Sequence, residues 1–319
     1  MEIGIDIGGT HTRIVVADHG SPIGEVSAAT ADWRQGTLFS DEANADRLLA
    51  LIPGGVVGRA DVPLVAGVHG CDTSDQCHLL QSWLQARHLG PVLVVNDSEL
   101  LGPAMGFRSA IAVVCGTGSI VVGRNGSGEL VKVGGYGWLL GDPGAAPSLV
   151  REAVVAILQA DDAGVNPGPL AKALIAHYGS PDPVGLGYDF TADAGITKWG
   201  VLAPLVFEAA ERGDQLAVDV IETDGRRLAD DVVRLRAKGV TSQDVVMAGG
   251  VVTSQPRLQR AFTSALSSVA PELRVHMLKE APVGGALALA AWILQPTDAM
   301  SQRFPLERTG KEESRQGVR

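Results

Sequence analysis

The chain has 319 residues, of which 45% are hydrophobic and 19% are charged, and its formal net charge is -10. This length predicts two domains, because one hydrophobic core rarely serves more than about 250–300 residues. The acidic balance argues against a nucleic-acid partner, since such proteins usually carry a basic face. Any phosphate site must therefore be local, built from backbone amides and a metal ion.

Cysteine usage indicates a reducing compartment, because three cysteines cannot all pair within one chain. The sequence opens directly into a strand, so we predict no signal peptide. Every apolar run is interrupted by Gly, Pro or a charged residue well before it reaches 18 residues, so we predict no transmembrane helix. A cytoplasmic protein is therefore expected. Cys71, Cys77 and His78 do not match a zinc-binding spacing.

The N-terminal residues 3–17, IGIDIGGTHTRIVVA, predict two apolar strands joined by the turn Gly8-Gly9-Thr10. Glycine lets successive backbone N–H groups converge on an anion, so the turn is a candidate phosphate site; an ordinary hairpin turn is the alternative. Asp6 lies inside the first strand, where a carboxylate is costly without a partner or solvent. Residues 22–28 complete a three-stranded meander.

Polar residues follow three further predicted elements. Asp32 and Trp33 lie in the loop after the meander, where the carboxylate can accept hydrogen bonds and the indole offers an apolar face; a loop acid beside a packed Trp is the alternative. A buried strand is predicted over residues 62–68, and His69 and Asp72 follow it. Ligands of open α/β sheets bind at such carboxyl ends of strands. Helices are predicted over residues 44–52 and 74–89.

The strand over residues 91–96 ends at Asn96 and is followed by Asp97 and a short helix. A carboxylate fixed at a strand end can serve as a general base. Asp97 could also cap the helix over residues 98–105, a frequent use of Asp.

A second glycine turn, Cys115-Gly116-Thr117-Gly118-Ser119, joins the apolar runs IAVVC and SIVVG about a hundred residues after the first. The repetition indicates an internal duplication. We therefore expect two similar lobes, each presenting a turn to a phosphate held between them.

The remainder alternates between helices and one firm strand. Helices are predicted over residues 147–160, 169–178, 198–212 and 214–238, and a buried strand over 245–251 ends in Gly249-Gly250. A small-residue helix over 282–297 precedes a polar tail, 298–319, that we expect to be disordered.

These motifs, in this order, resemble the sugar kinase, heat-shock protein and actin superfamily, and most closely the N-acetylglucosamine kinases and the BadF/BadG/BcrA/BcrD ATPase family. The resemblance runs from residue 3 to about residue 296. It implies two ribonuclease H-like α/β lobes with an interdomain cleft: an N-terminal lobe (1–108), a C-terminal lobe (109–281) and a closing helix (282–297).

The resemblance also implies ATP, Mg²⁺ and a sugar as ligands, in a homodimer. It places Mg²⁺ at Asp6, the catalytic base at Asp97 and adenosine against Gly249 and Gly250. The residues implied for the phosphates are Gly8, Gly9, Thr10, Thr12, Arg13, Gly116, Thr117, Gly118 and Ser119. Those implied for the sugar are Asp32, Trp33, His69, Asp72, Asn96, Gly135 and Asp142. Arg13 could equally be a solvated strand charge.

The segment GGYGWLLGDPG, residues 134–144, is similar to the family's GGWG…GDEGS element but has Pro143 for Glu and Ala145 for Ser. Loss of the Glu removes a charged contact from the sugar pocket that the resemblance implies. The expected reaction is phosphorylation of the 6-hydroxyl of glucosamine or N-acetylglucosamine, with glucosamine slightly favoured. An ATPase activator of a 2-hydroxyacyl-CoA dehydratase, and a non-catalytic nucleotide-gated binding protein, are the alternatives.

Overall fold

The computed structural model describes residues 1–166 and 168–294, arranged in two compact units. The first unit comprises residues 1–95, 127–129 and 286–294, and the second comprises 96–126 and 130–285 among these described residues. The predicted tail over 298–319 and the end of the predicted closing helix lie outside the described residues.

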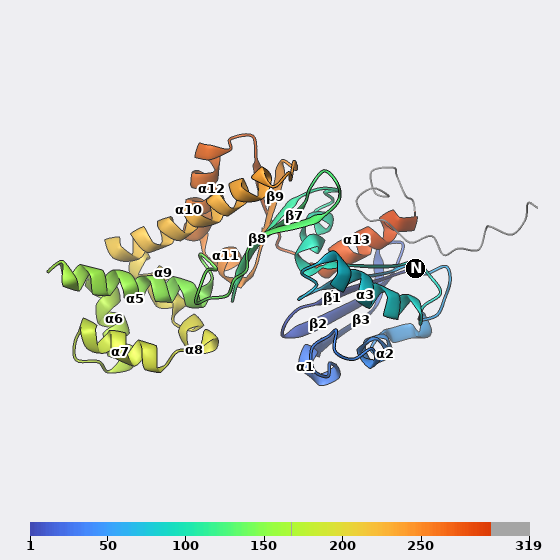
Figure 1. Cartoon of the computed structure of the whole chain (residues 1–319), viewed down its shortest axis with the longest axis horizontal. Helices are drawn as coiled ribbons and strands as arrows, with labels where there is room; N and C mark the ends of the chain where they lie inside the picture. The colour runs from blue at the N-terminus through green and yellow to red at the C-terminus, as the bar shows by residue number, and fades with distance from the viewer. Residues whose placement is uncertain (167, 295–319) are drawn as a thin grey trace, which may run out of the picture. The chain divides into compact units, whose positions relative to one another are not determined.

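The first unit is built on a five-stranded sheet of order β3-β2-β1-β4-β5 (Figure 1). Its strands are β1 (Glu2–Ile7), β2 (His11–Asp18), β3 (Ser21–Ala29), β4 (Leu64–Val68) and β5 (Val92–Asn96). The first three form the predicted antiparallel meander, and β4 runs parallel to β1. The ends of β1 and β4 therefore meet at the same edge of the sheet.

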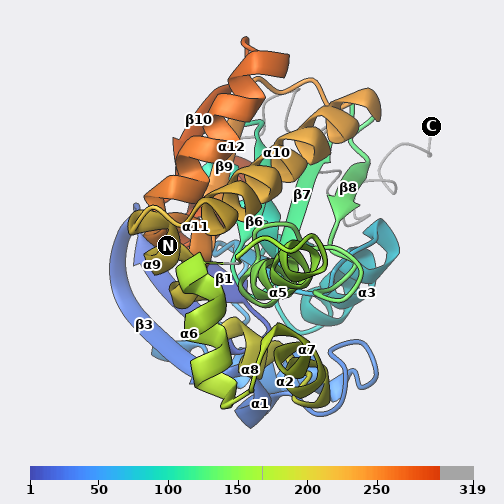
Figure 2. The ribbon, with the colours of Figure 1, turned by 90° about the vertical axis from the view of Figure 1, so that its left-hand side faces the viewer.

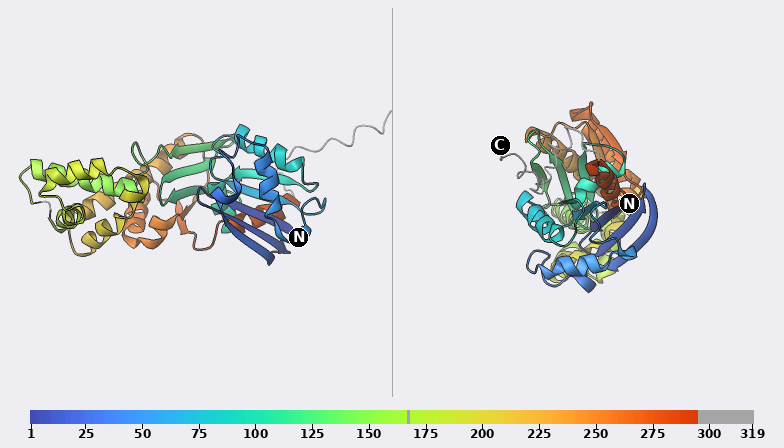
Figure 3. Two further views of the ribbon diagram at one scale, coloured as in Figure 1. Left: turned by 90° about the horizontal axis from the view of Figure 1, so that it is seen from below. Right: turned by 90° about the vertical axis from the view of Figure 1, so that its right-hand side faces the viewer.

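Helices cover both faces of this sheet (Figures 1 and 3). Apolar side chains of α2 (Ala43–Ala50) and α3 (Ser74–Gln85) form one core with Ile3, Ile5 and Ile7 of β1. On the other face stands α13 (Val283–Leu294), where a Cβ on Gly4 would lie only 2.9 Å from Leu287. Short turns α1 (Thr30–Trp33) and η1 (Pro53–Gly55) complete the unit.

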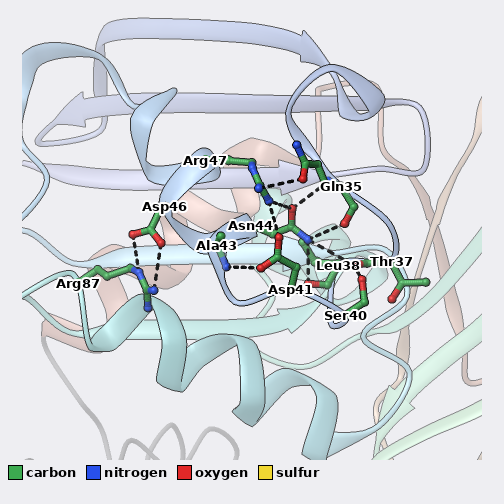
Figure 4. Close-up of polar contacts among 10 residues, drawn as sticks. All are labelled: Gln35, Thr37, Leu38, Ser40, Asp41, Ala43, Asn44, Asp46, Arg47 and Arg87. Carbon is green, nitrogen blue, oxygen red and sulfur yellow. Dashed lines mark hydrogen bonds and ion pairs between the residues drawn. The ribbon is translucent and has the colours of Figure 1, made fainter.

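A buried amide holds the loop between α1 and α2 (Figure 4). Asn44 accepts a hydrogen bond from the Gln35 backbone N–H at 2.9 Å and donates to the Gln35 carbonyl at 3.0 Å. Arg47 binds Asp41 at 2.9 Å and the Gln35 side chain at 3.0 Å. The loop that follows Asp32 is thus fixed by side chains of α2.

The second unit repeats the strand order of the first. Its sheet has the order β10-β9-β6-β7-β8. When the strands of each sheet are numbered in chain order, both sheets have the order third-second-first-fourth-fifth, counted here from β8 and in the first unit from β3. The strands are β6 (Ile111–Cys115), β7 (Ser119–Arg124), β8 (Leu130–Gly134), β9 (Asp244–Ala248) and β10 (Arg274–Met277). The predicted duplication is therefore present in the topology.

Long helices pack on one face of this second sheet, and α10 and α12 lie side by side (Figure 2). Their apolar residues share a core with β6, β7 and β9. The helices of this unit are η2 (Asp97–Leu100), α4 (Leu101–Ala104), α5 (Ala146–Asp162), α6 (Gly168–Tyr178), α7 (Pro183–Ala192), α8 (Ile196–Gly200), α9 (Ala203–Glu211), α10 (Gln215–Ala237), α11 (Gly250–Ser254) and α12 (Pro256–Val269). On the opposite face, Leu101 of α4 packs against Ala112 and Val246.

The structure divides one predicted helix and contains elements that were not predicted. The helix expected over 198–212 divides into α8 and α9, because Pro204 fits the first turn of a helix but not its interior. Helix α7, begun by the Asp182 cap, was not predicted, and neither were α12 and β10. No helix in the described part of the chain is long and apolar enough to cross a bilayer.

Candidate active site

The first glycine turn joins β1 to β2 and lies against the end of β4. The Gly8 N–H donates to the His11 carbonyl at 2.9 Å, which closes the turn and leaves Gly9 and Thr10 exposed. A Cβ on Gly9 would stand 3.4 Å from the His69 ring. The turn can therefore present exposed backbone amides to an anion, with His69 beside it.

Asp6 is the next-to-last residue of β1 and is half-buried, opposite Arg13 on β2 and Gly67 on β4. The described residues contain no group of three or more His, Cys, Asp or Glu side chains that could hold a metal ion. A single carboxylate suits Mg²⁺, which keeps most of its waters and needs few protein ligands. Asp6 beside a turn of exposed amides fits that requirement.

Two residues predicted to face ligands are buried beneath the turn. The Thr12 hydroxyl lies 3.0 Å from that of Thr30 and accepts a hydrogen bond from the Trp33 indole N–H at 3.0 Å. Thr30 in turn donates to the Gly8 carbonyl at 2.9 Å. Because Thr12 and Trp33 are buried, we give them a supporting role and leave them out of the proposed ligand contacts.

The other predicted residues of the first unit lie at its surface. Asp32, His69 and Asp72 are exposed, while Arg13 pairs with Glu25 on β3 at 2.7 Å. The His69 backbone N–H donates to the Ile7 carbonyl at 2.7 Å, which fixes the end of β4 against β1. Arg13 thus acts as a strand charge, while Asp32, His69 and Asp72 lie at the surface of this unit.

The second glycine turn forms a close backbone junction with the end of β9. A Cβ on Gly249 would lie 2.4 Å from the Cys115 carbonyl oxygen, and one on Gly116 would lie 3.3 Å from the Gly250 nitrogen. The Ser119 hydroxyl is buried and has no hydrogen-bond partner among the described residues. The Gly116 N–H donates to the Gly118 carbonyl at 2.9 Å, so the unused Ser119 hydroxyl is the donor that this turn can offer to phosphate oxygens together with the N–H groups at its tip. Thr117 is exposed at its tip.

Asp142 connects this turn to the loop over residues 134–144. Its carboxylate accepts a hydrogen bond from the Gly137 N–H at 3.2 Å and one from the Ser119 N–H. Burial raises the pKa of Asp142, although both N–H donors favour the charged form. Because Asp142 is 5% exposed, we assign it to holding the two loops together and leave it out of the proposed sugar contacts. Gly135 is exposed on the same loop.

Asp97 is half-buried and occupies the first position of η2. The N-cap of this turn is Asn96, whose side chain accepts a hydrogen bond from the Ser98 N–H at 3.0 Å. Asp97 also accepts from the Ser98 N–H at 3.0 Å. The capping role considered for Asp97 thus belongs mainly to the residue before it.

Buried groups that the sequence did not identify support these loops. Asp224 of α10 accepts a hydrogen bond from the Gly144 N–H at 2.9 Å, and Arg227 bridges Asp224 and Glu152 at 3.3 and 3.1 Å. Burial raises the pKa of Asp224 to about 6, while Gly144 and Arg227 act in the opposite direction. An Asp within the apolar spacing of α10 was the only sequence signal.

Folding stability is expected to depend on pH through Asp224. Its folded pKa of about 6 exceeds the ordinary 3.8, so its contribution is complete below pH 3.8 and is lost as the pH rises through 6. Relative to Asp224→Asn, the wild type should lose on the order of 2–3 kcal/mol of unfolding free energy between pH 4 and 7. Urea unfolding of both proteins over this range measures the difference. Parallel curves would contradict the shift, and exposed Asp219→Asn is the control.

The three cysteines are buried. Burial raises the pKa of the Cys115 thiol and so disfavours its thiolate form. Metal clusters require thiolates that can reach the metal. This gives no support to the dehydratase-activator alternative.

Comparison with known proteins places this geometry in a family. The model of the family described as the BadF/BadG/BcrA/BcrD ATPase family matches residues 3–290. The chain is 26% identical over 231 residues to an N-acetylmuramic acid/N-acetylglucosamine kinase of Clostridium acetobutylicum, covering 70% of this chain and 75% of that protein. It is 24% identical over 242 residues to a glucosamine kinase of Vibrio cholerae, covering 74% and 81%.

A solved structure from Chromobacterium violaceum, provisionally named an N-acetylglucosamine kinase, has a TM-score of 0.64 and 24% identity. The likeness covers 91% of this chain and 98% of that one. The predicted α/β fold with two duplicated lobes is therefore confirmed.

Proposed function

The chain belongs to the BadF/BadG/BcrA/BcrD ATPase family, and on that premise we propose that it transfers the γ-phosphate of ATP to the 6-hydroxyl of an amino sugar. The main support is the pair of glycine turns, which occupy equivalent places after the first strand of two sheets with the same strand order. Each turn can bind phosphate oxygens through backbone amides.

The proposed chemistry assigns one role to each group. The turns at Gly8–Thr10 and Gly116–Ser119 bind phosphate oxygens, and Gly249 and Gly250 leave room for adenosine. Asp97 accepts the proton of the sugar hydroxyl as the new O–P bond forms, while the bond to the β-phosphate breaks and ADP leaves. Asp6 would hold Mg²⁺, whose charge offsets that of the phosphates when the ion is bound.

The proposed sugar contacts are the exposed carboxylates Asp32 and Asp72 together with His69. Asn96 and Gly135 rest on the family resemblance alone, and Asn96 is buried with its amide oxygen engaged in the turn. Carboxylates can accept hydrogen bonds from sugar hydroxyls or pair with an ammonium.

Glucosamine and N-acetylglucosamine are the proposed acceptors. Relatives named for each sugar support both. The proposed carboxylate contacts Asp32 and Asp72, together with the replacement of the family's Glu by Pro143, favour glucosamine slightly. A homodimer, implied by the resemblance, belongs to the same proposal and can be measured by light scattering.

The deciding experiment measures ADP formation by the purified chain with ATP, Mg²⁺ and each sugar in turn, with glucose as a comparison. We expect ADP release that depends on an amino sugar, and NMR of the product should place the phosphate on carbon 6. ADP release at one rate with and without every sugar would remove the kinase function.

A further inference from the structure

The turn that carries Asp97 is closed by a reciprocal capping box. Asn96 accepts from the Ser98 N–H, while the Glu99 carboxylate accepts from the Asn96 N–H at 3.2 Å. Asn96, Ser98 and Glu99 are all buried, so Asp97 is the member of the turn that is half-buried. The backbone on both sides of the proposed base is therefore fixed by side chains of its own turn.

Glu99 also makes an ion pair with Arg124, the last residue of β7. Arg124 Nε lies 2.6 Å from Glu99 Oε1, and its Nη2 lies 3.0 Å from Oε2. The side chains are 3% and 12% exposed. A buried pair of this kind gains little stability over an apolar replacement, because both charges lose their water, but its two parallel bonds fix the geometry.

Strand β7 connects this pair to the phosphate turn. It begins at Ser119, the last residue of the second glycine turn, and ends at Arg124. The strand is paired with β6 on one side and β8 on the other, so it is a stiff element. Phosphoryl transfer depends on alignment of the attacking hydroxyl with the phosphate, and small displacements of the aligning groups slow it strongly.

We propose that Glu99 and Arg124 are positioning residues that set the place of Asp97 relative to the phosphate turn over residues 116–119. The inference rests on the proposed function, since it takes Asp97 as the base. Neither residue is proposed to touch the sugar or ATP; Arg124 anchors Glu99, and Glu99 fixes the backbone before Asp97.

The test uses the double variant Glu99→Gln/Arg124→Gln in the full chain, because removing both charges avoids leaving one buried and unpaired. We expect kcat with the active sugar to fall by about 10- to 100-fold, with the KM for ATP within about twofold of wild type. Hydrogen exchange at the Asn96 amide should quicken, because the neutral side chain that replaces Glu99 is a weaker acceptor and is no longer held by Arg124. The single variants Glu99→Gln and Arg124→Gln complete a double-mutant cycle.

The matched control is Asp244→Asn/Arg274→Gln, which removes another bidentate pair of the same unit, with distances of 2.9 Å. This control should keep kcat. A folded double variant of Glu99 and Arg124 with unchanged kcat and unchanged exchange would overturn the inference.

The outcomes also separate this inference from the proposed function. If wild type is active and Asp97→Asn is not, the function stands whatever the pair variants show. If wild type has no sugar-dependent activity, the function fails, and the amide exchange alone then decides whether the pair fixes the turn.

Discussion

Asp97→Asn is expected to lower kcat for the amino sugar by about 10²–10⁴-fold, the usual contribution of a general base. The amide cannot take the proton of the attacking hydroxyl. Its oxygen can still accept the Ser98 N–H, now bonded to Asp97 at 3.0 Å, so the turn should persist. The KM for ATP should change little, because the proposed nucleotide contacts lie elsewhere. Steady-state kinetics with each substrate varied separately provide the measurement.

Asp32→Asn is a useful comparison, because the proposed role of that exposed residue is to bind the sugar. It should raise the KM for the sugar more than it lowers kcat. If Asp97→Asn kept more than about a tenth of the wild-type kcat, the residue would not be the base.

The sequence was sufficient to predict the strands that carry the glycine turns. Runs of β-branched residues indicate buried strands, and a glycine pair after them indicates a turn with bare amides, whatever surrounds it. The same reasoning predicted the duplication, which the two equal strand orders confirm. These features depend on residues that are neighbours in the sequence, so short sequence patterns were enough to predict them.

The fate of individual polar residues depended on contacts distant in sequence. Thr12 and Trp33 lie beside exposed polar residues in the chain, yet the indole N–H and the hydroxyl meet in the core, 21 positions apart. Arg124 reaches Glu99 across 25 positions, and Asp224 reaches Gly144 across 80. No periodicity or motif spacing in the sequence predicts contacts between residues so far apart. The Asn96 to Glu99 capping box is local, with a spacing visible in the sequence, but Asp97, and not Asn96, was considered as the cap.

Residues 253–281 show the same limit for whole elements. Helix α12 and strand β10 form there although no helix or strand was assigned. Helix α12 is stabilised by burying Leu258, Phe262 and Leu266, at helical spacing, against the core of the second unit. The helical spacing of these three apolar residues is visible in the sequence. The helix that α12 packs against, α10, became evident only in the fold.

Gly249→Ala is expected to reduce both stability and ATP binding. The added Cβ would lie 2.4 Å from the Cys115 carbonyl oxygen and 2.8 Å from its nitrogen, and the residue has a φ of +115°, which L side chains rarely adopt. Strain and overpacking together should lower the free energy of unfolding by about 2–5 kcal/mol. Urea denaturation and calorimetric titration with ATP and Mg²⁺ measure the two effects.

Gly250→Ala separates packing of the chain from contact with the nucleotide. A Cβ on Gly250 meets no protein atom within 4 Å, so its stability should match that of wild type. If adenosine lies against this turn, the added methyl should still weaken ATP binding by about tenfold, a loss of about 1.4 kcal/mol. A Gly250→Ala protein that binds ATP as tightly as wild type would show that the turn serves the fold alone, because the methyl then points into space that no ligand uses.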